Sequence, residues 1–313
     1  MSLLLAGAAL SCSGAGGGAN DAPGGAGSGG VVAATGGGGG TGPGGGSGGE
    51  LGCPKGPGFA PTGAPQLINH VTARLLDESG APAAQVPVLV CGFGACSKPG
   101  TTSAQGELCT LDKATGLCSP GMQPGLEITR PALKYGLGIE HVKFAQLLPP
   151  GSEHAVGDVT AFRLPEVAQG AALVPGSTAT SNGVSVTLAP DTTLEHDLLV
   201  FDEPALLGFR ATLIPIAKAP GAVDPSLGFG ILVGTTPVDT KLCPPAALSV
   251  PNTAGWAAGT EVEIWVHGVS ILEDWAPYGG WGKLSNGRVS DDGTRVTSTG
   301  GVPILGLFGI RKL

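Results

Sequence analysis

The sequence has few charged residues and no cluster of positive ones. Charged side chains make up 13% of the 313 residues, and the formal net charge is −8. Proteins that bind nucleic acid concentrate Lys and Arg on one face, where they neutralise phosphates. A basic amphipathic helix suited to anionic lipid is missing as well. The composition therefore predicts no nucleic-acid partner.

Catalytic and cofactor motifs are also missing. No nucleophile elbow occurs in a strand–turn–helix setting, and the zinc-protease, Walker A and dinucleotide fingerprints do not occur. Asp291-Asp292-Gly293 lacks the further ligands of an EF-hand and predicts a turn. We therefore predict a protein that is not an enzyme, with no metal and no cofactor.

The few histidines leave one enzymatic alternative open. Each of Glu140-His141, Glu153-His154 and Glu195-His196-Asp197 places a carboxylate next to an imidazole. Adjacent residues of a strand face opposite sides, so these neighbours do not form ready acid–base pairs. The alternative is a secreted hydrolase whose fold gathers His141, His196 or His267 with distant carboxylates.

No apolar run approaches the roughly 20 residues of a membrane-spanning helix. The run from Leu3 to Leu10 has the length of the apolar region of a secretory signal. Ala9-Leu10-Ser11-Cys12 follows and resembles the lipobox of bacterial lipoproteins, although the usual leucine is displaced to Leu10 and no Lys or Arg precedes the run. The alternative is a disordered N-terminus with an incidental cysteine.

The lipobox resemblance implies a location and a partner. Residues 1–12 would be the signal segment, and Cys12 would carry lipid and hold the protein on a membrane. The protein would be exported, and the outer membrane or cell surface is preferred because Ser13, not Asp, follows the cysteine.

Residues 13–52 are predicted to be a disordered tether. They contain 21 glycines and only two charges, so they cannot bury enough apolar surface to offset chain entropy. About 40 such residues reach roughly 35 Å, which suits them to holding a domain away from lipid headgroups.

Six cysteines follow Cys12, an even number that favours up to three disulfides in an exported chain. They are Cys53, Cys91, Cys96, Cys109, Cys118 and Cys243. The four between residues 91 and 118 lack the tight pairs of a zinc ribbon, so zinc is the weaker alternative. A long Cys53–Cys243 bridge is one of the pairings considered.

The predicted fold class is all-β, with two β-sandwich domains at residues 53–165 and 166–313, because strand and turn patterns dominate. In the first domain, strands are expected at 71–76, 86–91 and 159–164, with a turn at 77–82 between the first two. Residues 101–109 are expected to form a strand–turn–strand with Gly106 at the turn, and residues 141–148 either a helix or a strand. In the second domain, they are expected at 183–188, 198–201, 209–214, 229–233, 248–250 and 261–267.

The first domain resembles the carboxypeptidase regulatory-like domain, a transthyretin-like β-sandwich. The family pattern is a strand, D-x-x-G-x-P, a V-x-V strand and then T-x-x-x-G, and it covers roughly residues 68–112. The matching residues are Asp77, Gly80, Pro82, Val86, Val88, Thr102 and Gly106. The resemblance implies a non-catalytic accessory module. The cysteines between Gly92 and Lys98 depart from the pattern.

The end of the second domain is similar to ZU5-like sandwich segments of bacterial surface proteins. The similarity rests on P-N-x-x-G-x-x-x-G-T-x-V at residues 251–262 and on G-x-V-S-x-D-G at residues 287–293. In the second piece, Asp292-Gly293 is expected to form a tight hairpin.

All four tryptophans lie between residues 256 and 281. Period-two alternation places Val262, Ile264 and Val266 on one face of strand 261–267. The other face carries the first members of an expected ligand surface, which consists of Trp265, His267, Trp275, Tyr278 and Trp281. Aromatic rings with nearby carboxylates are typical of sugar-binding surfaces. Packing of these rings inside the fold is the alternative.

The predicted function is therefore binding or structural display at the cell envelope by a lipid-anchored, non-catalytic protein. One alternative is a glycan-binding or adhesion module that uses the tryptophan-rich block. The expected partners are membrane lipid at Cys12 and an envelope polysaccharide or protein.

Overall fold

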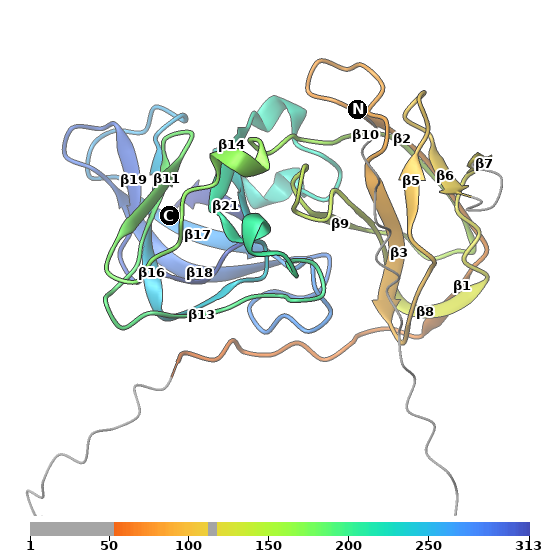
Figure 1. Ribbon diagram of the computed structural model, residues 1–313, viewed down its shortest axis with the longest axis horizontal. Helices are drawn as coiled ribbons and strands as arrows, with labels where there is room; N and C mark the ends of the chain where they lie inside the picture. The colour runs from red at the N-terminus through yellow and green to blue at the C-terminus, as the bar shows by residue number, and fades with distance from the viewer. Residues whose placement is uncertain (1–52, 112–117) are drawn as a thin grey trace, which may run out of the picture. The chain divides into compact units, whose positions relative to one another are not determined.

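The computed structural model describes residues 53–111 and 118–313, and within that part the chain is built from β-strands and four short 3-10 turns. The all-β prediction is confirmed (Figure 1). The predicted lipid site at Cys12 and the predicted tether at 13–52 lie outside the described residues. No helix in the described part is both long and apolar enough to cross a membrane.

The first half of the described chain, residues 53–165, carries two sheets. Its strands are β1 (Pro65–Ile68), β2 (His70–Leu76), β3 (Pro87–Phe93), β4 (Ala95–Cys96), β5 (Gly100–Thr102), β6 (Leu108–Leu111), β7 (Cys118–Pro120), β8 (Leu126–Tyr135), β9 (Phe144–Leu147) and β10 (Glu153–Thr160). The larger sheet has the order β1-β8-β3-β5-β6-β7, with β4 on β3 and β9 on β8. β2 and β10 form a separate parallel pair. Apolar residues of both sheets share one core, as in a sandwich.

The residues of the D-x-x-G-x-P motif make the turn that they predict. The Asp77 carboxylate accepts hydrogen bonds from the backbone N–H groups of Ser79 and Ala81 at 2.8 and 3.0 Å. Gly80 has φ 88°, which a residue with a side chain rarely adopts. Asp77 thus closes the turn after β2, and Gly80 supplies its left-handed backbone.

Thr102 of the same motif fixes a buried crossing of the chain. Its hydroxyl donates to the carbonyl of Ala83 at 2.5 Å and accepts from the N–H of Val86 at 2.9 Å. Both backbone groups lie in the core, where an unpaired polar group is costly. Gly106 follows at φ 78°, so close to the carbonyl of Leu75 that a Cβ would not fit.

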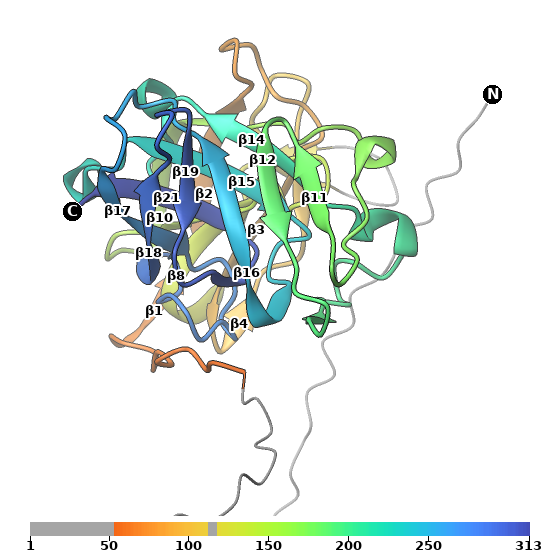
Figure 2. The same ribbon diagram turned by 90° about the vertical axis from the view of Figure 1, so that its left-hand side faces the viewer.

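The second half, residues 166–313, forms one eleven-stranded sheet. Its strands are β11 (Thr178–Ser181), β12 (Val184–Thr187), β13 (Thr193–Glu195), β14 (Arg210–Ile214), β15 (Ile231–Thr236), β16 (Lys241–Pro251), β17 (Glu261–His267), β18 (Trp281–Val289), β19 (Arg295–Ser298), β20 (Val302–Ile304) and β21 (Leu307–Lys312). The order is β11-β12-β16-β19-β18-β17-β21-β15-β14 (Figure 2). β13 and β20 pair with β16 outside this order.

This sheet curls until its first and last strands meet. The side chain of Asn182 donates to the carbonyl of Ala211 at 2.9 Å, and the N–H of Ala211 donates to Ser181 Oγ at 3.1 Å. The apolar side chains of β12, β16, β17 and β21 fill the interior of this near-barrel. The curl covers backbone groups of an edge strand that would otherwise be open to pairing.

Two local predictions in the second half have opposite outcomes. The expected Asp-Gly hairpin joins β18 to β19, with Gly293 at φ 72°. The expected strand at 198–201 is wrong, because that segment is a turn. The Asp197 carboxylate accepts from the N–H of Leu199, and its carbonyl accepts from Val200 and Phe201. An aspartate that bonds its own following backbone competes with strand formation.

The hydrophobic core crosses the predicted boundary between residues 165 and 166. No sheet spans that boundary, since β10 ends at Thr160 and β11 begins at Thr178. The main core of the first half nevertheless includes Ile214, Phe229 and Leu307 from the second half. Residues 53–313 accordingly form one compact unit.

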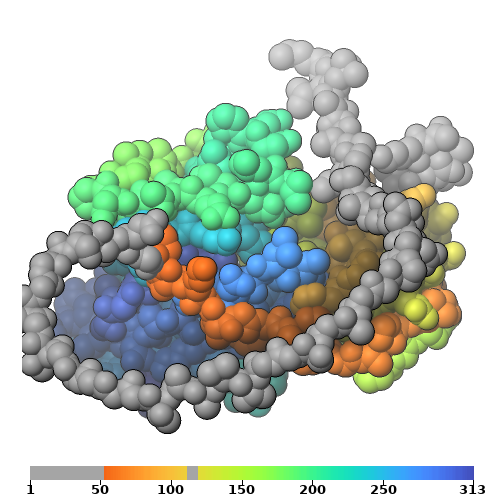
Figure 3. All heavy atoms as spheres, turned by 90° about the horizontal axis from the view of Figure 1, so that it is seen from below, coloured from red at the N-terminus to blue at the C-terminus, as the bar shows by residue number. Residues whose placement is uncertain are grey.

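The segment after Cys53 begins against the second half and only then enters the first. Cys53 is bonded to Cys243 of β16. Gly58 then donates its N–H to the carbonyl of Asp274 at 3.1 Å, and Gly56 lies so close to Asp274 that a Cβ would not fit. Figure 3 shows this orange segment against the blue surface of the second half. The chain reaches β1 of the first half at Pro65.

Candidate functional site

The aromatic residues expected to form one ligand surface lie in three environments. Trp265 and Trp281 are half-buried against the main core of the first half. Phe229 lies between them, with ring centroids 6.5 Å from Trp265 and 4.7 Å from Trp281. The His267 ring is 5.0 Å from that of Trp281. The structure therefore gathers Trp265, Trp281 and His267 into one aromatic row with Phe229.

His267, at the inner end of this row, is fully buried. Its Nδ1 donates to the carbonyl of Gly280 at 2.9 Å, which leaves Nε2 to accept from the N–H of Ala145 at 3.2 Å. Burial lowers the pKa of His267 to about 4. The ring is therefore neutral and holds the two halves together.

Tyr278 and Trp275 lie apart from the aromatic row. Tyr278 is buried, and its hydroxyl donates to the carbonyl of Cys91 at 3.1 Å. Its ring contacts Phe93 edge-on. Trp275 is half-buried against the core of the near-barrel. The expected platform of five exposed residues is thus not assembled, because the first half covers the end of β17 that carries His267.

The uncovered end of β17 forms one side of an open groove of about 580 Å³. The groove lies where the beginning of β17 and the end of β21 approach the beginning of β15. It is lined by Leu227, Gly228, Gly230, Trp256, Glu263, Arg311, Lys312 and Leu313. It is therefore the candidate ligand site, and Trp256, which was not among the expected surface residues, is its aromatic member.

Trp256 is held in place by Asn252 of the P-N-x-x-G motif. The Asn252 side chain donates to the carbonyl of Trp256 at 2.7 Å and accepts from its N–H at 3.1 Å. A second donation, to the carbonyl of Gly293 at 2.8 Å, ties this loop to the hairpin between β18 and β19. The indole then lies directly on Gly230, where a Cβ would lie 2.5 Å from the ring. The motif therefore presents a fixed aromatic ring.

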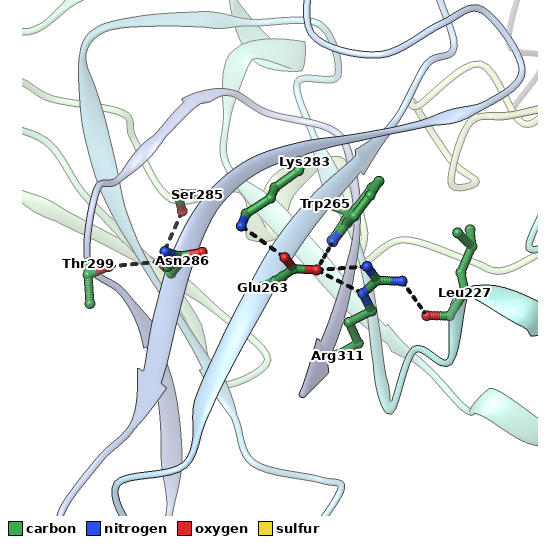
Figure 4. Close-up of polar contacts among 8 residues, drawn as sticks. All are labelled: Leu227, Glu263, Trp265, Lys283, Ser285, Asn286, Thr299 and Arg311. Carbon is green, nitrogen blue, oxygen red and sulfur yellow. Dashed lines mark hydrogen bonds and ion pairs between the residues drawn. The ribbon is translucent and has the colours of Figure 1, made fainter. Parts of the chain in front are cut away.

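Glu263 is the centre of the polar network beside the groove (Figure 4). Its carboxylate accepts from Lys283 Nζ at 2.9 Å, from Arg311 Nε at 2.9 Å and from Trp265 Nε1 at 3.1 Å. The guanidinium of Arg311 lies 4.6 Å from the centre of the Trp265 ring and also donates to the carbonyl of Leu227 at 3.1 Å.

The network fixes the charge of Glu263. Hydrogen bonds from Lys283 above all, and then from Arg311 and Trp265, lower the pKa of this carboxyl to about 2. A carboxylate with so low a pKa, whose oxygens already accept three hydrogen bonds, is a poor general base. What the groove offers is a fixed aromatic ring beside the polar network around Glu263.

Sequence reasoning missed Arg311 and Asn252, although one signal pointed to Arg311. Glu263 and Arg311 lie directly opposite each other on the antiparallel strands β17 and β21. Opposite charges at paired strand positions stabilise a sheet. The continuous apolar residues before Arg311 concealed its strand, so the pairing could not be recognised.

The other histidines of the hydrolase alternative do not join this groove. His141 is buried, and burial together with the Arg163 charge lowers its pKa. His196 bonds the Thr240 hydroxyl at 3.0 Å through Nδ1. No ion pair between either imidazole and a carboxylate occurs within the described residues.

The disulfide prediction is confirmed for five of the six cysteines. Cys53 pairs with Cys243, and Cys91 pairs with Cys96 across β3 and β4. Cys109 is also disulfide-bonded. The side chain of Cys118 lies outside the described part. Disulfide bonds at Cys91, Cys96 and Cys109 engage three of the four cysteines that the zinc alternative requires as ligands.

Comparison with known proteins leaves the family open. No family model matches the sequence, and no curated protein matches it. Among solved structures, the Bacillus anthracis TIE protein is similar over 79% of this chain and 45% of its own, with 12% identity and a TM-score of 0.21. The chain thus spans less than half of that structure's length. A similarity this weak carries no argument about fold or function.

Proposed function

We propose that this protein is a non-catalytic binding module displayed at the cell surface, and that the groove beside Trp256 binds a saccharide. The observation that carries the proposal is the fixed Trp256 ring. Asn252 and Gly230 hold it at the edge of an open groove. A ring fixed before binding loses little conformational entropy when the ligand arrives.

The charged side chains of the network beside the groove are engaged within the protein. The carboxylate of Glu263 is paired with both Lys283 and Arg311, so each of these three side chains already has an ion-pair partner. A saccharide stacks its apolar C–H face on an aromatic ring and meets polar groups at its edges, which is what the Trp256 side of this groove provides.

The display part of the proposal rests on the N-terminal sequence and on the disulfides. The lipobox-like residues before Cys12 would supply a lipid anchor, and residues 13–52 would supply the tether. Disulfides persist in oxidising compartments outside the cytoplasm, so the bridges Cys53–Cys243 and Cys91–Cys96 agree with export.

Binding of the full chain to an array of envelope and host glycans tests the groove. We expect binding by the wild-type protein and at least a tenfold loss in Trp256→Ala. Phe59→Ala is the matched control, because Phe59 is an exposed aromatic residue that does not line the groove. Wild-type protein that binds no glycan, or a folded Trp256→Ala variant with unchanged affinity, would refute the saccharide proposal.

The anchor is tested separately in a bacterial host. We expect the wild-type protein in the membrane fraction, with a lipid-modified peptide that begins at Cys12. Cys12→Ala should release the protein into the soluble exported fraction. A soluble wild-type protein that retains Met1 would contradict the anchor and leave the groove test unaffected.

A further inference from the structure

A buried Lys–Asp pair lies where the two halves meet, and neither residue lines the groove. Lys143 directly precedes β9 of the first half, and Asp239 lies between β15 and β16 of the second. Their side chains are only 4% and 10% exposed. The amine nitrogen of Lys143 is 2.7 Å from Oδ2 of Asp239.

A third ionisable side chain, Glu273 of the loop after β17, interacts electrostatically with both members of this pair. It is 8% exposed. Its Oε2 accepts from the N–H of Val269 at 3.3 Å, while its Oε1 has no hydrogen-bond partner among the described residues. Burial, and then the negative charge of Asp239, raise the pKa of Glu273 well above its usual value. Burial therefore favours the protonated form of Glu273.

The apolar surroundings make a charged pair energetically unfavourable at this position. Val238 precedes Asp239 in the chain, and Val269 donates its N–H to Glu273. Both valines are buried in one apolar cluster. A second amine, Lys134, lies near enough that burial and the Lys143 charge lower its pKa to about 7. Removing charges from water is unfavourable even when they are paired. An amide in place of the pair would carry no charge.

We propose that Lys143 and Asp239 condense into an intramolecular amide bond that joins the two halves covalently. Lys143 first passes one proton to the Asp239 carboxylate. Its neutral Nζ then attacks Cγ of Asp239, a C–N bond forms, and the bond from Cγ to the protonated oxygen breaks. Glu273 donates its proton to the departing oxygen and regains a proton from the amine. The ammonium and carboxylate groups together lose one water, and Glu273 ends as it began, so no oxidant or other co-reactant is needed.

The geometry supplies what an amine and a carboxylate lack in water. Groups held at contact distance react as though at very high concentration, with effective molarities of about 10⁵–10⁸ M in well-oriented systems. Exclusion of water also disfavours hydrolysis of the product. The ion pair between Lys241 and Glu195, at 3.0 Å, is exposed and lacks this exclusion of water.

Intact mass spectrometry of the purified full chain, with disulfides reduced, tests the proposal. We expect the mass to fall short of the sequence mass by one water. A protease digest should contain a branched peptide that joins Lys143 to Asp239. Wild-type protein at full mass with no branched peptide would overturn the proposal, and this measurement does not depend on any variant.

Three variants assign the roles. Lys143→Arg keeps the positive charge and removes the amine, so the mass deficit should disappear. Glu273→Gln removes the titrating proton at similar volume and should strongly slow or abolish the bond. Lys134→Arg is the matched control, since Lys134 is a neighbouring lysine that is not paired with Asp239, and it should keep the deficit. A deficit that persists in Lys143→Arg would show a different linkage and refute this one.

Discussion

The Nε2 atom of His267 accepts a 3.2 Å hydrogen bond from the backbone N–H of Ala145, 122 residues earlier in the chain. The contact requires a neutral ring, because a protonated imidazole has no lone pair to accept with. It links β17 of the second half to β9 of the first. The state of one imidazole therefore affects how the two halves hold together.

Acidification should weaken the fold through His267. Its pKa is about 4 in the fold against 6.5 unperturbed, so the unfolded chain binds the proton more readily. The contribution of His267 is fully present above pH 6.5 and is lost as the pH falls towards 4, by about 3 kcal/mol in total. Urea unfolding measured from pH 7.5 to pH 4 tests this.

The matched variant for that experiment is His267→Gln, whose amide can accept from Ala145 and donate to Gly280 without titrating. We expect its stability to depend less steeply on pH in this window than that of the wild type. Equal slopes for the two proteins would show that His267 is not the responsible group.

Loss of the bridge between Cys53 and Cys243 should destabilise the protein more than loss of the bridge between Cys91 and Cys96. The first spans 190 residues and the second spans 5. Loop-closure entropy gives roughly 5 kcal/mol for the long loop and roughly 2 kcal/mol for the short one. Denaturant unfolding of the paired serine variants measures both. A short-loop variant that loses more than the long-loop variant would contradict this account.

Thr102→Val should cost about 2–3 kcal/mol, because it leaves the carbonyl of Ala83 and the N–H of Val86 buried without a partner. Valine matches threonine in shape, so packing changes little. Thr102→Ser, which keeps the hydroxyl, should retain most of the stability. The comparison uses the urea midpoint at constant slope, and similar losses in both variants would point to packing as the cause.

Asn252→Ala should free the Trp256 loop and lower stability by about 1–3 kcal/mol, since three hydrogen bonds are lost. Tryptophan fluorescence of the folded protein should shift to the red as the indole leaves Gly230. The exposed Asn286 provides the control, with an expected change within about 0.5 kcal/mol for Asn286→Ala. An unshifted spectrum would show that Gly230 alone positions the ring.

Local chemistry made much of the fold predictable from the sequence. The turn at Asp77 and Gly80, the turn at Gly106 and the hairpin at Gly293 each depend on a residue type that is required within a few positions. The strand Glu261–His267 was predicted with its observed bounds. β20 and β21 were missed because Val302–Ile310 is apolar almost throughout, and an unbroken apolar run hides the period-two signal.

The site was less predictable, because it depends on which surface the other half covers. Alternation along β17 correctly separated Val262 from Glu263, but no pattern within the strand reveals that Ala145 covers His267 while Glu263 stays beside an open groove. The pairing of Lys143 with Asp239 likewise joins residues 96 positions apart. Such contacts follow from tertiary packing and have no local signature.

The bond between Cys53 and Cys243 also decides how the molecule carries mechanical load. A pull on the residues before Cys53 enters β16 directly through this bridge. When a ligand in the groove beside Trp256 resists that pull, the tension runs through the near-barrel alone. The sandwich that contains β1 to β10 then lies outside the path of the force, so its strands do not bear the load.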